Sequence, residues 1–230
     1  MKIGISTWAY LDLPLGEALE RISRLSGRAE IICDAGHSLF FPENLESASS
    51  FSLKYTIHGL IADINIASIH PEFREVSVKL HRQAIEAGAA IGAELYIIHP
   101  GYTPWSFCWL DALQALDQSL AELAPLQEEL GIRLAVENMP KSDWLFFNRP
   151  DLDLHGMGLV LDVGHAQTCG TLSDFLRHPA LAHVHLHDNS GIIQKRDITA
   201  ALEQKTEKAI LESLEMLSKL KKEKAKHSEA

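Results

Sequence analysis

Six side chains that can bind a metal ion stand at the ends of short apolar runs in this 230-residue sequence. Imidazole nitrogens and carboxylate oxygens are ligands that zinc, manganese and related ions accept. Each of the six ends a run of its own, so their placement is selective. They are His58 in YTIHG, His99 in YIIHPG, Glu137 in LAVEN, Asp162 in LVLDVGH, His185 in HVHLHD and Glu203 in AALEQ.

Each of these residues also has a purely structural interpretation. A histidine such as His58 at a strand end often only bonds a loop carbonyl, and Asp162, two residues before Gly164, suits the cap of a following turn. Glu137 is harder to explain in this way, because a carboxylate that ends an apolar strand needs a partner to offset its burial. One shared site explains six strand ends more simply. We therefore predict a divalent metal, with Zn²⁺ or Mn²⁺ favoured over Mg²⁺, which prefers all-oxygen ligands.

The elements that position these residues alternate between short β-branched runs and longer segments of helical period. This alternation is typical of parallel βα units, and in a barrel of such units the carboxyl ends of the strands meet at one mouth. We predict an α/β fold, a (β/α)8 TIM barrel, with an open doubly wound sheet as the second choice. The predicted strands are Lys2–Thr7, Ala29–Cys33, Tyr55–His58, Glu94–His99, Arg133–Glu137, Gly158–Asp162, Ala182–His187 and Asp197–Glu203.

Apolar residues at helical spacing predict the helices between these strands. The period of the sequence indicates helices at Leu15–Leu25 and Glu72–Ile91. A leucine stripe from Leu110 to Leu130 predicts one long helix that Gly131 would cap. A last helix carries Ile210, Leu214 and Leu217 on one face. We expect residues 1–220 to form a single domain and residues 221–230 to be a charged tail.

The chain between the last two predicted strands is short. Neighbouring parallel strands need a crossover of about a dozen residues or more, normally with a helix. Only residues 189–196 lie between Asp188 and Asp197, and SGIIQKR has no helical pattern of useful length. We therefore predict an irregular barrel whose seventh helix is absent, with a bare loop in its place.

Composition and charge exclude several classes of protein. The 21 lysines and arginines against 31 aspartates and glutamates give a net charge of −10, which repels nucleic acid phosphates. Cys33, Cys108 and Cys169 are odd in number and lack CxxC spacing, which favours free thiols in a reducing compartment. We expect no signal peptide, because the N-terminus has no apolar run of that kind, and no segment is long enough to cross a membrane. We expect a cytoplasmic protein with no membrane or nucleic acid partner, and we leave oligomerisation open.

Other polar and aromatic residues give weaker signals. Trp8 follows the first strand, where it either walls a sugar-sized pocket or packs at the barrel rim. Glu30 is interpreted as a buried structural carboxylate. The other histidines of helices and loops show no partner pattern and are predicted at the surface. They are His37, His70, His81, His155 and His178.

Four motifs, IHPG, VENMP, LDVGHA and VHLHDN, follow His58 along the chain. Together they resemble the xylose isomerase-like barrel superfamily, which holds sugar and sugar-phosphate isomerases and epimerases and the AP endonucleases of the endonuclease IV type. The resemblance runs from residue 1 to about Asn189 and resumes at Glu203–Leu217. It implies a metal-dependent isomerase or epimerase that acts on a small sugar or sugar phosphate.

The resemblance also implies roles for individual residues. His58 and His99 match positions that add a metal in the endonucleases and line the sugar pocket in the isomerases. His165 matches a further endonuclease ligand. The positions that match the single metal of the isomerases and epimerases are Glu137, Asp162, His185 and Glu203. The residues expected to contact substrate are Trp8, His165, His187 and Asp188.

The mechanism that the resemblance implies is proton transfer next to a carbonyl through an enediolate. The metal would act as a Lewis acid on adjacent substrate oxygens, and Glu137 and Glu203 would move the proton from opposite sides of the sugar. The sequence departs from the superfamily after Asn189, where an Asp-x-His element and a full helix usually follow. Two alternatives stay open: a metal-dependent phosphodiesterase acting on abasic DNA, and a barrel that binds a ligand without turnover.

Overall fold

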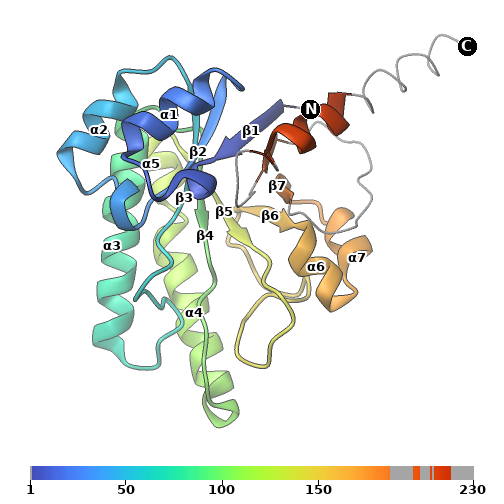
Figure 1. Cartoon of the computed structure of the whole chain (residues 1–230). Helices are drawn as coiled ribbons and strands as arrows, with labels where there is room; N and C mark the ends of the chain where they lie inside the picture. Colours follow the sequence, from blue (N-terminus) through green and yellow to red (C-terminus); the bar gives the residue numbers. More distant parts are fainter. Residues whose placement is uncertain (1, 187–198, 203–207, 209, 219–230) are drawn as a thin grey trace, which may run out of the picture.

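The computed structural model describes residues 2–186, 199–202, 208 and 210–218. Eight parallel strands close into a barrel in which each strand pairs with the next along the chain and β8 pairs with β1 (Figure 1). The predicted (β/α)8 class is confirmed, and the open sheet is not formed. The strands are β1 (Lys2–Ser6), β2 (Arg28–Ile32), β3 (Lys54–His58), β4 (Leu95–Ile98), β5 (Arg133–Glu137), β6 (Gly158–Asp162), β7 (Leu181–Leu186) and β8 (Thr199–Leu202).

Helices pack on the outside of the barrel (Figure 1). Pro71 begins the longest of them, in the first turn where its missing N–H costs nothing. Residues 210–218 are also helical, and Ile210 and Leu217 are buried there as predicted. No described helix is both long and apolar enough to cross a bilayer. The α-helices are α1 (Leu15–Ser23), α2 (Pro42–Ser49), α3 (Pro71–Ala90), α4 (Trp109–Leu123), α5 (Leu126–Leu130), α6 (Val163–Cys169) and α7 (Leu172–Leu176).

The leucine stripe was predicted to form one helix, and that prediction is wrong. The stripe divides into α4 and α5 at Pro125, which has no N–H to continue the α4 ladder. Leu110, the first residue of the stripe, is 77% exposed, so it lies off the buried face. Gly131 ends α5 with a φ of 66°, the left-handed conformation expected of a C-terminal cap.

The strand residues divide between two apolar clusters. Successive side chains of a strand point to opposite faces, so residues two apart share a face. One face of the strands packs against the helices in the large core. The other face forms a small separate cluster inside the barrel, made of Leu95, Ile97, Ala135 and Val160. Two residues further along these same strands stand His99, Glu137 and Asp162. The barrel interior is therefore apolar below and polar at its carboxyl-terminal mouth.

One crossover of the barrel lacks a helix. All of residues 138–157, between β5 and β6, are described, and none of them is helical. This segment folds onto the loop after β4, where Tyr102 and Leu145 form an antiparallel bridge and the Thr103 N–H donates to the Trp144 carbonyl over 2.8 Å. We predicted that no helix connects the seventh and eighth strands. This connection includes residues 187–198, which lie outside the described part of the chain.

Candidate metal centre

The barrel brings five of the six predicted strand-end residues to one mouth. His58, Glu137 and Asp162 are the last residues of β3, β5 and β6. His99 directly follows β4, and His185 faces Asp162 in the register between β6 and β7. Four of these five side chains are fully buried, and His99 is partly buried. Together with His165 we call them the Glu137 cluster.

Glu137 lies at the centre of this cluster. Its Oε2 atom is 3.2 Å from His99 Nε2 and 3.4 Å from His58 Nε2. Its Oε1 atom is 3.1 Å from His185 Nδ1 and 3.7 Å from His165 Nδ1. Four imidazole nitrogens therefore surround one buried carboxylate.

Asp162 has a capping role as well as a place in the cluster. Its Oδ1 atom accepts the His165 N–H of the first turn of α6 over 2.6 Å, so the structural interpretation of this residue is confirmed. Asn138, which follows Glu137, holds the strand end by accepting the Asp162 N–H over 2.7 Å and donating to the Asp162 carbonyl over 3.2 Å. A carboxylate has two oxygens, so the cap leaves Asp162 able to bind a metal through the other.

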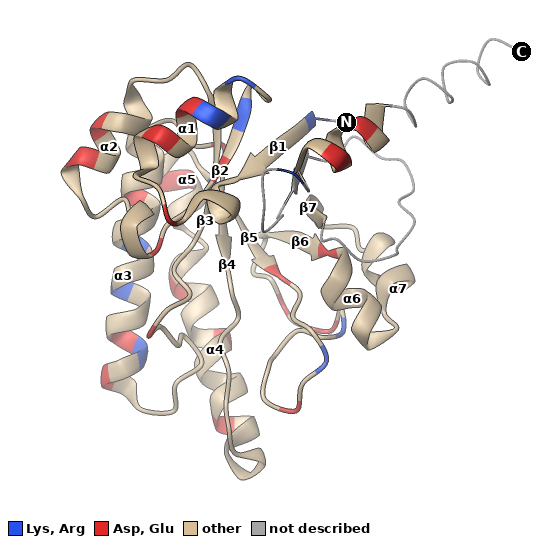
Figure 2. Ribbon diagram, viewed as in Figure 1, with Lys and Arg blue, Asp and Glu red and all other residues tan. Residues whose placement is uncertain are grey.

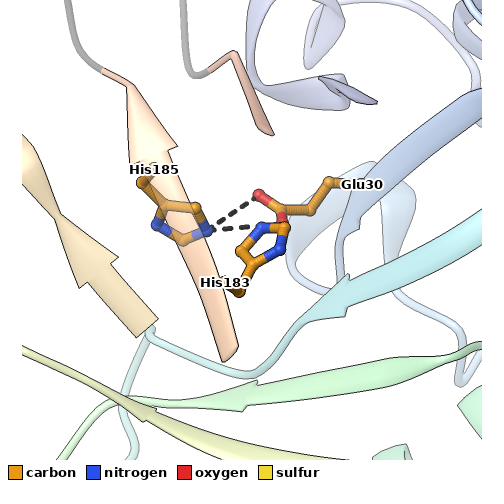
Figure 3. A group of neighbouring side chains, drawn as sticks. All are labelled: Glu30, His183 and His185. Carbon is orange, nitrogen blue, oxygen red and sulfur yellow. Dashed lines mark hydrogen bonds and ion pairs between the residues drawn. The ribbon is translucent and has the colours of Figure 1, made fainter. Parts of the chain in front are cut away.

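Glu30 and His183 join the site, and neither was predicted to belong to it. Glu30 Oε2 is 3.1 Å from His183 Nε2 and 3.3 Å from His185 Nε2 (Figure 3). All three side chains are at most 1% exposed. His183 stands two residues before His185, and the alternation of β7 puts both on the same face, which is the sequence signal that identifies it. We call Glu30, His183 and His185 the Glu30 triad.

The electrostatics of the two carboxylates are alike. Burial raises the pKa of Glu137, but the charge of His185 and hydrogen bonds from His185, His58 and His99 outweigh it and hold the pKa well below its ordinary value. Burial raises the pKa of Glu30 too, and the charge of His185 with hydrogen bonds from the two histidines again lowers it. Burial also lowers the pKa of His183. Both carboxylates are therefore ionised at neutral pH.

This donor set fits a divalent cation. Three groups of three ligand atoms lie within 4.8 Å of one another: His58, His99 and Glu137; Glu137, Asp162 and His165; and the Glu30 triad. A carboxylate among imidazole nitrogens is the mixed oxygen and nitrogen environment that Zn²⁺ and Mn²⁺ accept. The described residues can therefore hold such an ion beside Glu137.

A cavity of about 280 Å³ lies beside the Glu137 cluster, and His99 and His165 form part of its wall. Its other walls are largely apolar. They come from the loops after β3 and β5 and include Leu60, Ile61, Ile64, Ile66, Met139 and Leu145.

Two histidines predicted at the surface are buried, so that prediction is wrong for them. His81 lines the same cavity from α3, and its Nδ1 atom is 2.9 Å from the Tyr96 hydroxyl. His37 Nε2 is 2.8 Å from the Leu13 carbonyl, so the ring donates there as an N–H. Each polar partner lies far away in the sequence, which is why no local pattern revealed it.

The remaining predicted site residues are placed only in part. Trp8 lies in the 3-10 turn Thr7–Tyr10 after β1, is 40% exposed and does not line the cavity. His187, Asp188 and Glu203 fall outside the described residues. Glu203 follows Leu202, the last described residue of β8, whose backbone pairs with β1 and β7.

Residues 43–210 match the protein family described as the xylose isomerase-like TIM barrel. The chain belongs to this family. One relative is an uncharacterized protein of Methanocaldococcus jannaschii, 35% identical over 198 residues, which cover 83% of this chain and 79% of the relative. Membership of the xylose isomerase-like family agrees with the resemblance carried by the four motifs.

Three solved structures are similar to this one. A D-tagatose 3-epimerase-like protein has a TM-score of 0.84 at 26% identity, over 95% of this chain and 96% of its own. The IolI protein, solved with a zinc atom, has a TM-score of 0.73 at 14% identity, over 90% of each chain. Endonuclease IV from Thermus thermophilus has a TM-score of 0.57 at 19% identity, over 83% of this chain and 78% of its own. At such identities the last two share the fold alone.

Proposed function

We propose that this protein is a divalent-metal-dependent isomerase or epimerase of small sugars. The observation that carries the proposal is the buried carboxylate of Glu137, ringed by imidazoles at the barrel mouth and next to a cavity. Active sites of such barrels lie at this mouth. The likeness to a D-tagatose 3-epimerase-like protein supports the same reaction class.

Glu137, Asp162 and His185 would hold the ion, with Glu203 as the fourth ligand that the family resemblance implies. The bound ion supplies Lewis acidity toward adjacent oxygens of the substrate. The reaction itself is proton transfer at the carbon next to the carbonyl, by way of an enediolate. Glu137 accepts and returns the proton on one side, and Glu203 does so on the other. His99, which lines the cavity, would donate a hydrogen bond to a sugar oxygen, and His58 lies behind it between Glu137 and the Gly59 carbonyl.

The cavity favours a neutral sugar over a sugar phosphate. Among the described residues that line it, none is a lysine or an arginine, and phosphate recognition normally uses such groups or backbone N–H clusters. Apolar walls such as Leu60 and Ile66 suit the C–H faces of a sugar ring, and the histidines suit its hydroxyls. We also propose that residues 1–220 form one domain and that the protein works in the cytoplasm.

A substrate panel tests the proposed function. The protein is stripped with chelator, reloaded with Zn²⁺ or Mn²⁺, and incubated with ketohexoses, ketopentoses and their phosphates. We expect metal-dependent interconversion of a free ketose, followed by chromatography and by solvent deuterium uptake at the epimerised carbon. Deuterium uptake is the signature of proton transfer. If no sugar exchanges deuterium and an abasic duplex is nicked instead, the protein is a phosphodiesterase and the proposal is wrong.

A further inference from the structure

We infer that Glu30 is a positioning residue, which holds the His185 ring with its proton on Nε2 and so presents Nδ1 to a metal at Glu137. The inference rests on the metal site of the proposed function. It does not depend on which sugar, if any, the protein converts. It assigns a purpose to Glu30 and His183, which the proposed reaction leaves unused.

The His185 ring lies between two buried carboxylates. Its Nδ1 atom is 3.1 Å from Glu137 Oε1, and its Nε2 atom is 3.3 Å from both oxygens of Glu30. A neutral imidazole has one N–H and one lone pair, and a carboxylate can only accept a hydrogen bond. A metal held at Glu137 needs the lone pair on Nδ1. The proton must then stand on Nε2, where Glu30 accepts it, as carboxylates do behind many metal-bound histidines.

His183 fixes the carboxylate of Glu30 in turn. Its Nε2 atom is 3.1 Å from Glu30 Oε2, and its ring meets the His185 ring edge-on, with centroids 5.2 Å apart (Figure 3). The buried Nδ1 atom of His183 has no hydrogen-bond partner among the described residues. A buried N–H without an acceptor is costly, so the proton of this ring belongs on Nε2, toward Glu30. Glu30 therefore accepts two N–H groups at once.

The contact crosses the barrel. Glu30 comes from β2 and the two histidines come from β7, and β8 and β1 lie between these strands in the sheet. The link is therefore made through the barrel interior, beneath the mouth, and it does not depend on any surface loop. The His185 ring links Glu30 to Glu137, because the two carboxylates face opposite nitrogens of that ring.

The triad itself meets the distance requirement for a metal site, but the structure favours the positioning role. The three side chains are almost completely buried, and none of them lines the cavity beside the Glu137 cluster. An ion bound to His185 Nε2 would need a lone pair on that nitrogen. In the positioning role the same nitrogen carries the proton. A count of bound metal ions separates the two arrangements.

The test compares Glu30→Gln with the wild-type full-length chain, with Glu94→Gln as the matched control. Glu94 pairs with Arg28 at the other end of the barrel, and its substitution removes the same charge. A glutamine at position 30 loses the negative charge, and its NH₂ group replaces one carboxylate oxygen. His185 Nε2 is 3.3 Å from both oxygens, so this NH₂ group would face the His185 N–H donor to donor. We expect metal affinity, measured by chelator competition, to fall roughly 10- to 100-fold in Glu30→Gln and to stay unchanged in Glu94→Gln. Glu30→Asp, which keeps the carboxylate, should recover part of the affinity.

A second readout does not need turnover. Nitrogen-15 NMR of the zinc-loaded wild-type protein reports the tautomer of His185, and we expect the metal on Nδ1 and the proton on Nε2. A proton on Nδ1 would overturn the inference, and so would wild-type metal affinity in Glu30→Gln. Loss of a second bound equivalent in His183→Gln, with the first retained, would instead show a metal site at the triad and also overturn it. A protein that binds metal but converts no sugar refutes the proposed function alone.

Discussion

Burying the carboxylate of Glu137 inside the barrel costs free energy, and its neighbours offset that cost. A buried charge is tolerated only where hydrogen bonds and opposite charges replace the lost water. Four imidazole nitrogens within 3.7 Å supply this replacement. A divalent cation beside Glu137 would offset the same buried charge, with imidazole lone pairs as its further ligands. Structure and proposed function therefore depend on the same contacts.

Which of these residues the sequence reveals depends on where their partners lie. His58, Glu137 and Asp162 were predicted to share a site because each ends an apolar strand of the barrel. Glu30 was predicted to be buried but not to join the site, because its partners in β7 are more than 150 residues away along the chain. Asn138 belongs to the VENMP motif, but its side-chain bonds go to the backbone of Asp162, 24 residues further along, so a local pattern does not reveal its role.

The burial of the His81 side chain predicts that the stability of the protein depends on pH. Burial, reinforced by the charge of His99, lowers the pKa of His81 from 6.5 to about 3. The unfolded chain therefore takes up a proton at this ring below about pH 6.5, whereas the folded chain does not until about pH 3. The contribution of His81 to the free energy of unfolding is therefore complete above pH 6.5. It is lost as the pH falls from about 6.5 to about 3.

Urea unfolding at pH 7.5 and pH 5.5 measures the effect, with His81→Gln as the comparison. We expect the wild type to lose about 1.4 kcal/mol more unfolding free energy than the variant between these two pH values. Equal losses in the two proteins would mean that His81 is protonated in the folded chain as readily as in the unfolded one.

At the scale of elements, strands were easier to predict than their connections. Strands β1–β7 agree with the sequence prediction to within about one residue, because each is a buried apolar run bounded by polar residues. The break between α4 and α5 was missed because the leucine spacing continues across Pro125. The helix-free crossover of residues 138–157 depends on contacts with the loop after β4, which a local pattern does not encode.

Gly59 links the end of β3 to the neighbouring strand, and a side chain cannot fit there. A Cβ atom at this position would lie 2.3 Å from the Ile97 carbonyl oxygen and 2.6 Å from the Tyr96 hydroxyl. We expect Gly59→Ala to lower the unfolding free energy by about 1–3 kcal/mol and to weaken metal binding, because His58 is the preceding residue. Denaturant unfolding and chelator competition measure the two effects.

Gly27→Ala is the control for this substitution, since nothing lies within 4 Å of a Cβ atom there. We expect its stability and metal affinity to stay near those of the wild type. A Gly59→Ala protein as stable as the Gly27→Ala protein would show that β3 and β4 can separate at no cost, and that the close approach does not position His58.

At the scale of the whole molecule, the net charge supports the small-molecule substrate that we propose. The net charge is −10, and in the described part of the chain basic residues are interspersed with acidic ones along α1 and α3 (Figure 2). Binding of a nucleic acid backbone gains most of its affinity from a basic face. An abasic-DNA nuclease can share this fold, but the charge of this chain opposes such a substrate.

The central claim is that Glu137 holds a divalent ion at the barrel mouth, and metal content tests it most directly. The wild type, Glu137→Gln and the control Glu94→Gln are produced with zinc and manganese supplied, purified without chelator and analysed for metals, with circular dichroism to verify folding. We expect about one equivalent of Zn²⁺ or Mn²⁺ in the wild type and the control, and almost none in folded Glu137→Gln, because the amide removes the anionic ligand. A metal-free wild type, or a Glu137→Gln protein that retains its metal, would contradict the account.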